Sequence, residues 1–287
     1  MKAYKADLHL HTTASDGSDT PRELIAKAKA RGIDVIAVSD HDTLVGSLEA
    51  VSLPDSDIKV ITGIEFSCHH YGECDFDCHI LGYGFDPESD ELLAAIAHGR
   101  EMRLAKLEAR LKYLKEHFDI SFTDADIEWL HSLNSVARPH LGQLLIKYGY
   151  VKEMSEAFDR YLKVGGFPDD RIDSAEAIAA IRSAGGIPVY AHPIGGEREK
   201  RLTRAEVTER IDALIGEGLG GIECYYSRYS YEDETMLLEL ASDRALLVSG
   251  GSDYHGENKT VRLGVLRLDE SEIEADRISV LTAIMAR

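Results

Sequence analysis

Short apolar segments alternate with amphipathic helical segments along most of this 287-residue chain, and this alternation constrains its fold more than any other feature. Apolar runs bounded by turn residues are typical of strands. The predicted strands cover 3–8, 34–38, 59–64, 78–83, 187–191, 221–225 and 246–249. Strands that alternate with helices imply a parallel sheet, and closure into a barrel fits this pattern better than an open sheet. The sequence therefore predicts an α/β fold, a seven-stranded (β/α) barrel.

The alternation is interrupted between residues 88 and 171, where the pattern is helical and rich in charge. The predicted helices here cover 91–117, 124–131, 139–148 and 155–162, the first of them long and amphipathic. We interpret 88–171 as a helical insertion that covers the substrate, and 1–87 with 172–287 as the barrel domain. A terminal strand over 265–268 and a last helix over 271–285 complete the prediction.

Most of the predicted strands end in a residue that can bind a metal ion. In Asp7-Leu8-His9-Leu10-His11 the spacing puts two imidazoles on one side of a strand end, close enough to share an ion. The other candidates at strand ends are His41, Glu65, His192, Asp253 and His255, and His79 lies within a strand. In (β/α) barrels the carboxyl-terminal strand ends meet on one face, which carries the active site. Two histidines near a terminus are often incidental, but this recurrence is hard to explain by packing.

Imidazoles and carboxylates with almost no cysteine suit Mn, Fe or Zn. The candidate ligands exceed the needs of one ion, so we expect two or three ions that share Glu65 as a bridge, with Mn as the first choice. Ions this close together can generate a bridging hydroxide and hold the oxygens of a transferring phosphoryl group.

The charge of the chain limits its partners. Lys and Arg number 32 against 51 Asp and Glu, and the formal charge of −19 opposes binding of long nucleic acid. A small anionic substrate remains compatible if local cations receive it. No long apolar run suggests a membrane span or a signal peptide, and the four cysteines form no CxxC pair. We therefore expect a cytoplasmic protein without membrane partners, and the oligomeric state stays open.

Seven motifs resemble, in order, those of the PHP (polymerase and histidinol phosphatase) phosphoesterases, which belong to the wider amidohydrolase group and have a distorted seven-stranded (β/α) barrel. The motifs are Asp7-Leu8-His9-Leu10-His11, Ser15-Asp16-Gly17, Ser39-Asp40-His41-Asp42, Gly63-Ile64-Glu65, His79-Ile80-Leu81-Gly82, Ala191-His192-Pro193 and Ser252-Asp253-Tyr254-His255. The resemblance implies three metal subsites. They are His9, His11, Glu65 and Asp253 for the first, Asp16, His41 and His255 for the second, and Glu65, His79 and His192 for the third. Some relatives have histidine at the position of Asp16.

Arg138-Pro139-His140 lies in the predicted insertion. In the small-molecule branch of the family an Arg and a His at the matching place meet the substrate phosphate. The resemblance thus implies that Arg138 binds the phosphate and that His140 protonates the leaving oxygen. The alternative is a surface arginine beside a histidine at a helix start. The predicted catalytic set is His140, Arg138, Glu65 and Asp253, and weaker candidates for a second anionic group are Arg171, Arg228, Lys259 and Arg262.

Three further groups of residues admit two interpretations each. Asp40 and Asp42 either orient imidazoles of the site or are polar loop residues. His69 and His70, with Cys68, Cys74 and Cys78, form either a further metal site or an ordinary loop, and the loop is favoured because the spacing fits no standard zinc pattern. Tyr225, Tyr226, Tyr229 and Tyr231 either stack on a base or sugar or pack in the fold.

The resemblance implies a metal-dependent phosphoesterase that hydrolyses a small phosphorylated metabolite through a metal-bridging hydroxide. The substrate would be a nucleotide mono- or bisphosphate or a ribose cyclic phosphate. One alternative is a 5′–3′ exonuclease on short oligonucleotides, against which the acidic charge argues. The other is a non-catalytic metal-binding sensor, against which the complete set of expected ligands argues.

Overall fold

The computed structural model describes residues 4–54, 57–163, 165–167, 171–197 and 199–287. Its strands are β1 (Ala6–Leu10), β2 (Val35–Val38), β3 (Lys59–His70), β4 (Phe76–Tyr83), β5 (Ile172–Asp173), β6 (Ile187–Tyr190), β7 (Gly221–Tyr226) and β8 (Leu247–Gly251). Its α-helices are α1 (Pro21–Ala30), α2 (Val45–Ser52), α3 (Asp90–Phe118), α4 (Asp124–Ser132), α5 (Arg138–Lys147), α6 (Met154–Ala157), α7 (Ser174–Ser183), α8 (Arg204–Glu217), α9 (Tyr231–Asp243) and α10 (Ser279–Met285). None of the described helices combines the length and apolar character that crossing a membrane requires.

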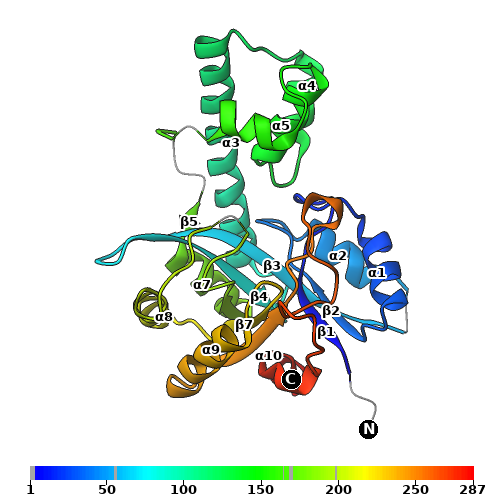
Figure 1. The fold of residues 1–287 in the computed structure, drawn as a ribbon, viewed down its shortest axis with the longest axis vertical. Coiled ribbons are helices and arrows are strands. Elements are labelled where there is room, and N and C mark those ends of the chain that lie inside the picture. The colour runs from blue at the N-terminus through cyan, green and yellow to red at the C-terminus, as the bar shows by residue number, and fades with distance from the viewer. Residues whose placement is uncertain (1–3, 55–56, 164, 168–170, 198) are drawn as a thin grey trace.

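Seven strands form a sheet in the order β1-β2-β3-β4-β6-β7-β8, which curves into a nearly closed barrel (Figure 1). Its two end strands meet just beyond β8, where the backbone N–H of Asp253 donates to the carbonyl of His9 at 2.9 Å. The N–H of His11 donates to the carbonyl of Tyr254, also at 2.9 Å, and Leu10 and Tyr254 form an isolated parallel bridge. The predicted (β/α) barrel is therefore confirmed.

The prediction of an all-parallel sheet is wrong at one strand. β4 runs antiparallel to both β3 and β6, while the other barrel pairs are parallel. β3 continues to His70, beyond its predicted end at residue 64, and only residues 71–75 separate it from β4. A connection this short cannot make the crossover that parallel neighbours need. Glu65 therefore lies inside β3, and the first half of β4 brings His79 to the edge where the parallel strands end.

The end of the chain also differs from the prediction. Residues 265–268 lie in an irregular loop rather than a strand, because Gly264 has a φ of 76° and the Val265 N–H donates back to the Arg262 carbonyl. Leu266 is nevertheless buried, so the apolar residues of this segment indicate burial in the core rather than pairing in a strand. The last helix, α10, begins only at Ser279. Ala3, at the start of the first predicted strand, lies outside the described residues.

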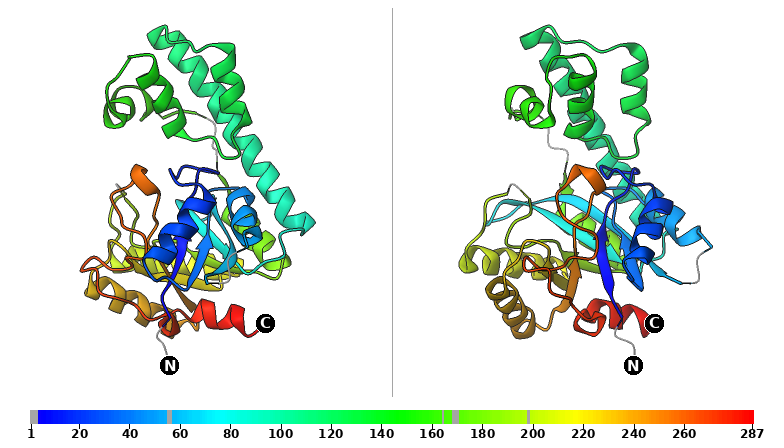
Figure 2. Two further views of the ribbon diagram at one scale, coloured as in Figure 1. Left: turned by 90° about the vertical axis from the view of Figure 1, so that its right-hand side faces the viewer. Right: turned by 45° about the vertical axis from the view of Figure 1, so that its right-hand side comes forward.

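The apolar core fills the inside of the barrel and the space between its sheet and its helices. Leu8, Ala37 and Val189 belong to the inner cluster, to which Leu281 of α10 also contributes. α10 thus covers the end of the barrel near the two termini (Figures 1 and 2). The outer helices begin at favourable residues. For example, Thr20 and Glu23 form a capping box at the start of α1.

Helices α3 to α6, followed by a π-helical turn (Phe158–Leu162), rise from the barrel as a separate lobe (Figure 2). α3 serves both parts. Leu92 near its start packs in a barrel cluster, whereas Leu107 and Leu114 pack with the other helices of the lobe. The chain returns through β5, which pairs with β3. The boundaries of the insertion at 88 and 171 stay a prediction.

Candidate metal centre

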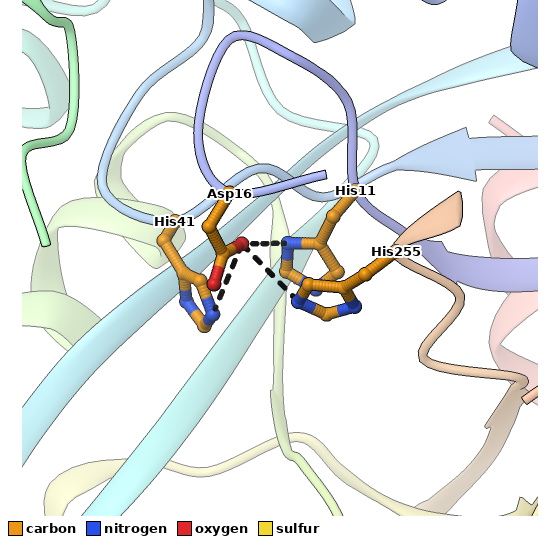
Figure 3. A group of neighbouring side chains, drawn as sticks. All are labelled: His11, Asp16, His41 and His255. Atoms are coloured by element: carbon orange, nitrogen blue, oxygen red, sulfur yellow. Dashed lines mark ion pairs between the residues drawn. The ribbon is translucent and has the colours of Figure 1, made fainter. Parts of the chain in front are cut away.

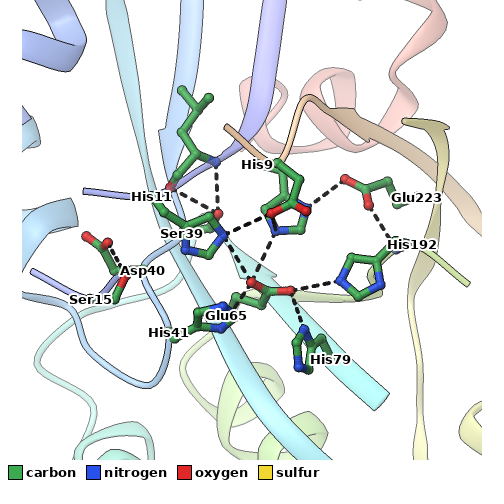
Figure 4. A network of polar contacts seen from close by, with 12 residues as sticks. His9, His11, Ser15, Ser39, Asp40, His41, Glu65, His79, His192 and Glu223 are labelled. Carbon is green, nitrogen blue, oxygen red and sulfur yellow. Dashed lines mark hydrogen bonds and ion pairs between the residues drawn. The ribbon is translucent and has the colours of Figure 1, made fainter. Parts of the chain in front are cut away.

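The buried carboxylate of Glu65 lies at the centre of a cluster of imidazoles (Figure 4). Its Oε2 is 3.1 Å from His9 Nε2, 3.1 Å from His11 Nε2 and 3.2 Å from His41 Nδ1, and its Oε1 is 2.9 Å from His79 Nδ1 and 3.3 Å from His192 Nε2. The two oxygens therefore face different sets of nitrogens. A carboxylate in this arrangement is able to bridge two neighbouring ions.

Asp16 and Asp253 extend the cluster on the other side of His11. Asp16 Oδ1 lies 3.2 Å from His255 Nε2, 3.8 Å from His11 Nδ1 and 4.0 Å from His41 Nε2 (Figure 3). Asp253 Oδ1 lies 3.5 Å from His11 Nε2. Within the described residues, three overlapping groups keep their ligand atoms within 4.8 Å of one another, namely His11-Asp16-His41-His255, His9-His11-Asp253 and His41-Glu65-His79. The structure thus brings all nine predicted ligands together.

Several ligand atoms in this cluster are buried without a hydrogen-bond partner among the described residues. They are His9 Nε2, both ring nitrogens of His11, His41 Nδ1, Glu65 Oε2 and His255 Nε2. A buried polar atom left in this state costs about 1–3 kcal/mol. Because the set consists of imidazoles and carboxylates, ions such as Mn, Fe or Zn would satisfy these atoms. The residues present therefore fit a metal centre.

Burial and charge divide the imidazoles into two kinds. Burial, with neighbouring histidines, holds the pKa of His11 well below its usual value, and burial lowers the pKa of His41 to about 4. Burial also acts on His9 and His192, but the Glu65 carboxylate, aided by other acids, outweighs it and raises the pKa of both. The shifts therefore favour the neutral, coordinating form of His11 and His41, whereas His9 and His192 gain affinity for a proton that they would have to release before binding an ion.

Glu223 on β7 orients two of the histidines, and the sequence analysis missed it. This fully buried carboxylate accepts a hydrogen bond from His9 Nδ1 at 3.0 Å and another from the backbone N–H of His192 at 2.8 Å (Figure 4). With its proton held at Nδ1, His9 presents the Nε2 lone pair to the cluster. The available signal was an acidic residue inside the apolar segment 221–225, which needs a buried partner.

Asp40 and Asp42 position loops of the site. Asp40 accepts hydrogen bonds from the N–H and Oγ1 of Thr12, both at 2.7 Å, and from Ser15 Oγ at 2.6 Å, and so holds the loop that carries Asp16. Asp42 accepts from the Ser67 N–H at 2.9 Å and from Arg103 Nε on α3 at 2.8 Å. In the described part of the chain neither carboxylate bonds to an imidazole of the cluster, so their contribution is to backbone geometry.

Three non-glycine residues at the site have a left-handed backbone. The φ angles are 52° for Asp42, 30° for His192 and 59° for Asp253. Such conformations cost about 1–3 kcal/mol each and persist where the surroundings fix them. The backbone of Asp253 is held by its N–H bond to the His9 carbonyl at 2.9 Å. Its carboxylate is held by Tyr226 Oη at 2.9 Å and Lys259 Nζ at 2.7 Å, both on Oδ2, which leaves Oδ1 turned toward the histidines.

The start of α5 places His140 at the edge of the cluster. The residue is 7% exposed, its Nδ1 accepts from the Ala137 N–H at 3.0 Å, and the Asp16 carboxylate acts on its pKa from the candidate metal cluster. Burial lowers the pKa of His140, which favours the neutral ring. The guanidinium of Arg138 lies 5.3 Å over the Phe158 ring. His140 thus reaches the predicted second subsite.

Two of the weaker candidates adjoin the cluster and two do not. Lys259 contacts Asp253, as described above, and Arg171 lines a cavity of about 340 Å³ that borders His79 and His192. The other two form ion pairs outside the ligand set, Arg228 with Glu197 at 2.9 Å and Arg262 with Glu270.

The segment with Cys68, His69, His70, Cys74 and Cys78 forms part of β3, β4 and the turn between them, with ordinary packing and ion-pair contacts. Cys68 and Cys78 are buried opposite each other on β3 and β4, while His69 pairs with Asp77 at 2.8 Å. Among the described residues this segment contributes no group of three close ligand atoms. Of the four tyrosines, Tyr225, Tyr226 and Tyr229 are buried in the fold, and Tyr231 is exposed.

A nearly closed (β/α) barrel whose strand ends carry a cluster of imidazoles and carboxylates defines the class of barrel metallohydrolases. Residues 7–169 match the family model described as PHP domain, and the chain belongs to that family. The predicted resemblance is therefore confirmed.

Similar proteins narrow this class further. The chain is 32% identical over 269 residues to a 5′-3′ exoribonuclease of Haemophilus influenzae, with 91% of this chain and 93% of the relative covered. It is 31% identical to a phosphoribosyl 1,2-cyclic phosphate 1,2-diphosphodiesterase of Eggerthella lenta (88% and 94% covered) and 32% identical to a 3′,5′-nucleoside bisphosphate phosphatase of Chromobacterium violaceum (87% and 86% covered). A crystal structure of a putative metal-dependent phosphoesterase from Bifidobacterium adolescentis superposes with a TM-score of 0.81 at 29% identity, covering 99% of this chain and 96% of that one. These relatives confirm the predicted enzyme class, a phosphoric ester hydrolase.

Proposed function

We propose that this protein hydrolyses a phosphate ester of a small metabolite at a centre of two or three ions, of which Mn is the first choice. The observation that carries the proposal is the convergence of five imidazoles on the buried carboxylate of Glu65, with ligand atoms that lack a hydrogen-bond partner. The identity of the ion depends on supply, because this ligand set accepts Mn, Fe and Zn.

The residues of the chain divide the work of the reaction. Bound ions supply Lewis acidity and an activated water. Glu65 and Asp253 hold the ligand sets in register, the latter because Tyr226 and Lys259 fix its outer oxygen. Arg138 binds the phosphate, and a planar guanidinium suits two phosphate oxygens at once. His140 offers its Nε2–H as a hydrogen bond to the reacting phosphate ester, since its Nδ1 already accepts from the Ala137 N–H and the lowered pKa favours the neutral ring.

The substrate class follows from what the relatives share. The names of the three relatives refer to a cyclic phosphate of phosphoribose, a nucleoside bisphosphate and RNA. Each of these contains a phosphorylated sugar unit. We therefore propose a nucleotide mono- or bisphosphate or a ribose cyclic phosphate as the substrate, in line with the acidic surface.

A second candidate is a 5′–3′ exonuclease that trims short oligonucleotides. The name of the Haemophilus influenzae relative favours it. The net charge of −19 opposes a long polyanion, so this activity would be confined to short strands.

Phosphate release by the Mn-loaded protein tests both candidates. The panel holds AMP, adenosine 3′,5′-bisphosphate, a ribose cyclic phosphate, histidinol phosphate and a short RNA. Dominant turnover of one small ester supports the proposal, and turnover of the RNA alone would make the protein a nuclease. Metal-loaded protein that is inert on the whole panel would indicate a non-catalytic binding module.

Asp253→Asn provides the matched test of the site. Asn tolerates the positive φ of this position, so the backbone is preserved while one ligand charge is lost. The variant is expected to lose metal and activity together, whereas Asp243→Asn at the exposed end of α9 retains both. Full turnover by Asp253→Asn would refute the assignment.

A further inference from the structure

A cavity of about 340 Å³ borders the metal centre on the side of His79 and His192. Its other walls come from β4, from the loop between β6 and α8, and from α8 itself. Arg138 and His140 of the insertion are not among its lining residues. The site therefore has two separate flanks, one under the insertion at the second subsite and one at this cavity.

The size of the cavity suits a small ligand. Small-molecule sites typically begin at about 300 Å³, and a sphere of the observed volume is about 9 Å across. This is room for a sugar ring that carries a phosphate. The ligand would remain in contact with the metal centre, because His79 and His192 form part of the wall.

The acidic residues that line the cavity already have partners. Asp77 lies 3.3 Å from Arg171 Nη2, and Glu206 lies 2.8 Å from Lys200 Nζ. Glu199 accepts a hydrogen bond from the Gly196 N–H at 2.7 Å. These contacts offset much of the negative charge that would otherwise repel an anion.

Arg210 also lines this cavity, and within the described part of the chain no acidic side chain forms an ion pair with it. Its guanidinium lies 4.5 Å over the Phe76 ring, and Nη1 donates to the Asp77 carbonyl at 3.5 Å. Both contacts fix the position of the group without neutralising it. In a chain with a net charge of −19, a partly buried arginine held in this way is typical of a site that receives an anion.

We propose that this cavity binds a second phosphate of the substrate, with Arg210 as its principal contact and Arg171 beside it. The inference rests on the proposed function, and it makes that function more specific. The ester that is hydrolysed lies at the metal centre, and the second phosphate, carried by the same sugar, lies across the cavity. The enzyme therefore selects bisphosphorylated sugars or nucleosides over singly phosphorylated ones.

Steady-state kinetics of the Mn-loaded full chain tests this selection. The measured quantity is the ratio of kcat/KM for adenosine 3′,5′-bisphosphate to kcat/KM for AMP. Arg210→Gln is expected to reduce the ratio by about tenfold or more, the typical loss for a hydrogen bond to a charged group. The matched control is Arg204→Gln on the same helix, whose partner is Glu239 at 2.8 Å and which leaves the ratio unchanged. An unchanged ratio in Arg210→Gln would overturn the proposal.

Calorimetric binding separates this proposal from the proposed function. If the wild-type protein hydrolyses neither compound, the phosphoesterase assignment fails, but the cavity still predicts tighter binding of the bisphosphate than of AMP. That preference should be at least about tenfold in the wild type and should disappear in Arg210→Gln. Equal affinities of the wild type for the two compounds would refute the cavity assignment. Metal analysis of each variant shows whether a lost affinity comes from lost ions.

Discussion

Arg103 links the insertion to the metal site through one buried guanidinium, and its removal gives a sharp prediction. The side chain is 8% exposed on α3 and pairs with Asp42, which is 2% exposed. It also donates to Ser67 Oγ on β3 at 2.8 Å and to the carbonyl of Val136, just before α5, at 3.3 Å. One group thus holds the loop after His41, the strand of Glu65 and the approach to Arg138.

Arg103→Met should lower the free energy of unfolding by about 3–5 kcal/mol, because it leaves the buried carboxylate of Asp42 without its counter-charge. Denaturant unfolding of the metal-free protein, with a chelator present, measures this loss without a contribution from ion binding. Arg100→Met is the control, since this exposed residue on the same helix donates only to the His131 carbonyl among the described residues. Its expected effect is within about 0.5 kcal/mol.

The double variant Arg103→Met, Asp42→Asn completes the cycle. It should cost less than the sum of the two single changes, because no buried charge is left unpaired. A loss below about 1 kcal/mol for Arg103→Met, or strict additivity in the double variant, would refute the assignment of this pair as a buried link.

Three further outcomes are expected. Glu223→Gln should weaken Mn binding by about 10- to 100-fold in calorimetric titration, because the carboxylate no longer fixes the tautomer of His9, and unaltered affinity would exclude that role. Because the pKa values of His9 and His192 are raised, both would release protons when ions bind, so Mn affinity should continue to rise with pH beyond about 6.5, the ordinary histidine pKa, and level off above the raised values. Proton release measured in two buffers checks the sign, and a pH-independent affinity would contradict it. Gly251→Ala should lower the free energy of unfolding by about 1–3 kcal/mol, because the added Cβ would lie 2.2 Å from the Cβ of His9. Gly216→Ala on α8 is the control: its added Cβ would have no atom within 4 Å, and the change should raise the free energy of unfolding by about 0.5–1 kcal/mol.

The barrel and the grouping of the candidate ligands were predictable because both leave short-range patterns in the sequence. Apolar runs between helices mark the strands, and a histidine or acid at a strand end is conspicuous in such a run. The nine candidate ligands therefore came together in space, eight of them in three groups of close ligand atoms and His192 through Glu65, even though they span the chain from His9 to His255. For the candidates at strand ends that grouping needs only the rule that strand ends share one face, whereas Asp16 was added by the motif resemblance.

What the sequence did not reveal depends on partners that are distant in the chain. The direction of β4 is set by the short turn after His70. The prediction ended β3 at residue 64, so the connection to β4 looked long enough for a parallel crossover. Glu223 looks like an isolated acid until His9 and the His192 backbone are placed beside it. Leu266 is apolar because it is buried, and burial alone does not distinguish a strand from a turn.

The nearly closed seam between β1 and β8 gives the ions a second consequence. The strands on its two sides meet through the isolated bridge of Leu10 and Tyr254, and the candidate ligands His11 and Asp253 face each other across it. An ion bound by both residues would cross-link them and close a loop that contains the chain from His11 to Asp253. Such a link restricts the unfolded chain strongly, as long loops do when they are tied at their ends. Loading the site would therefore also slow the opening of the barrel and protect its ends from proteases.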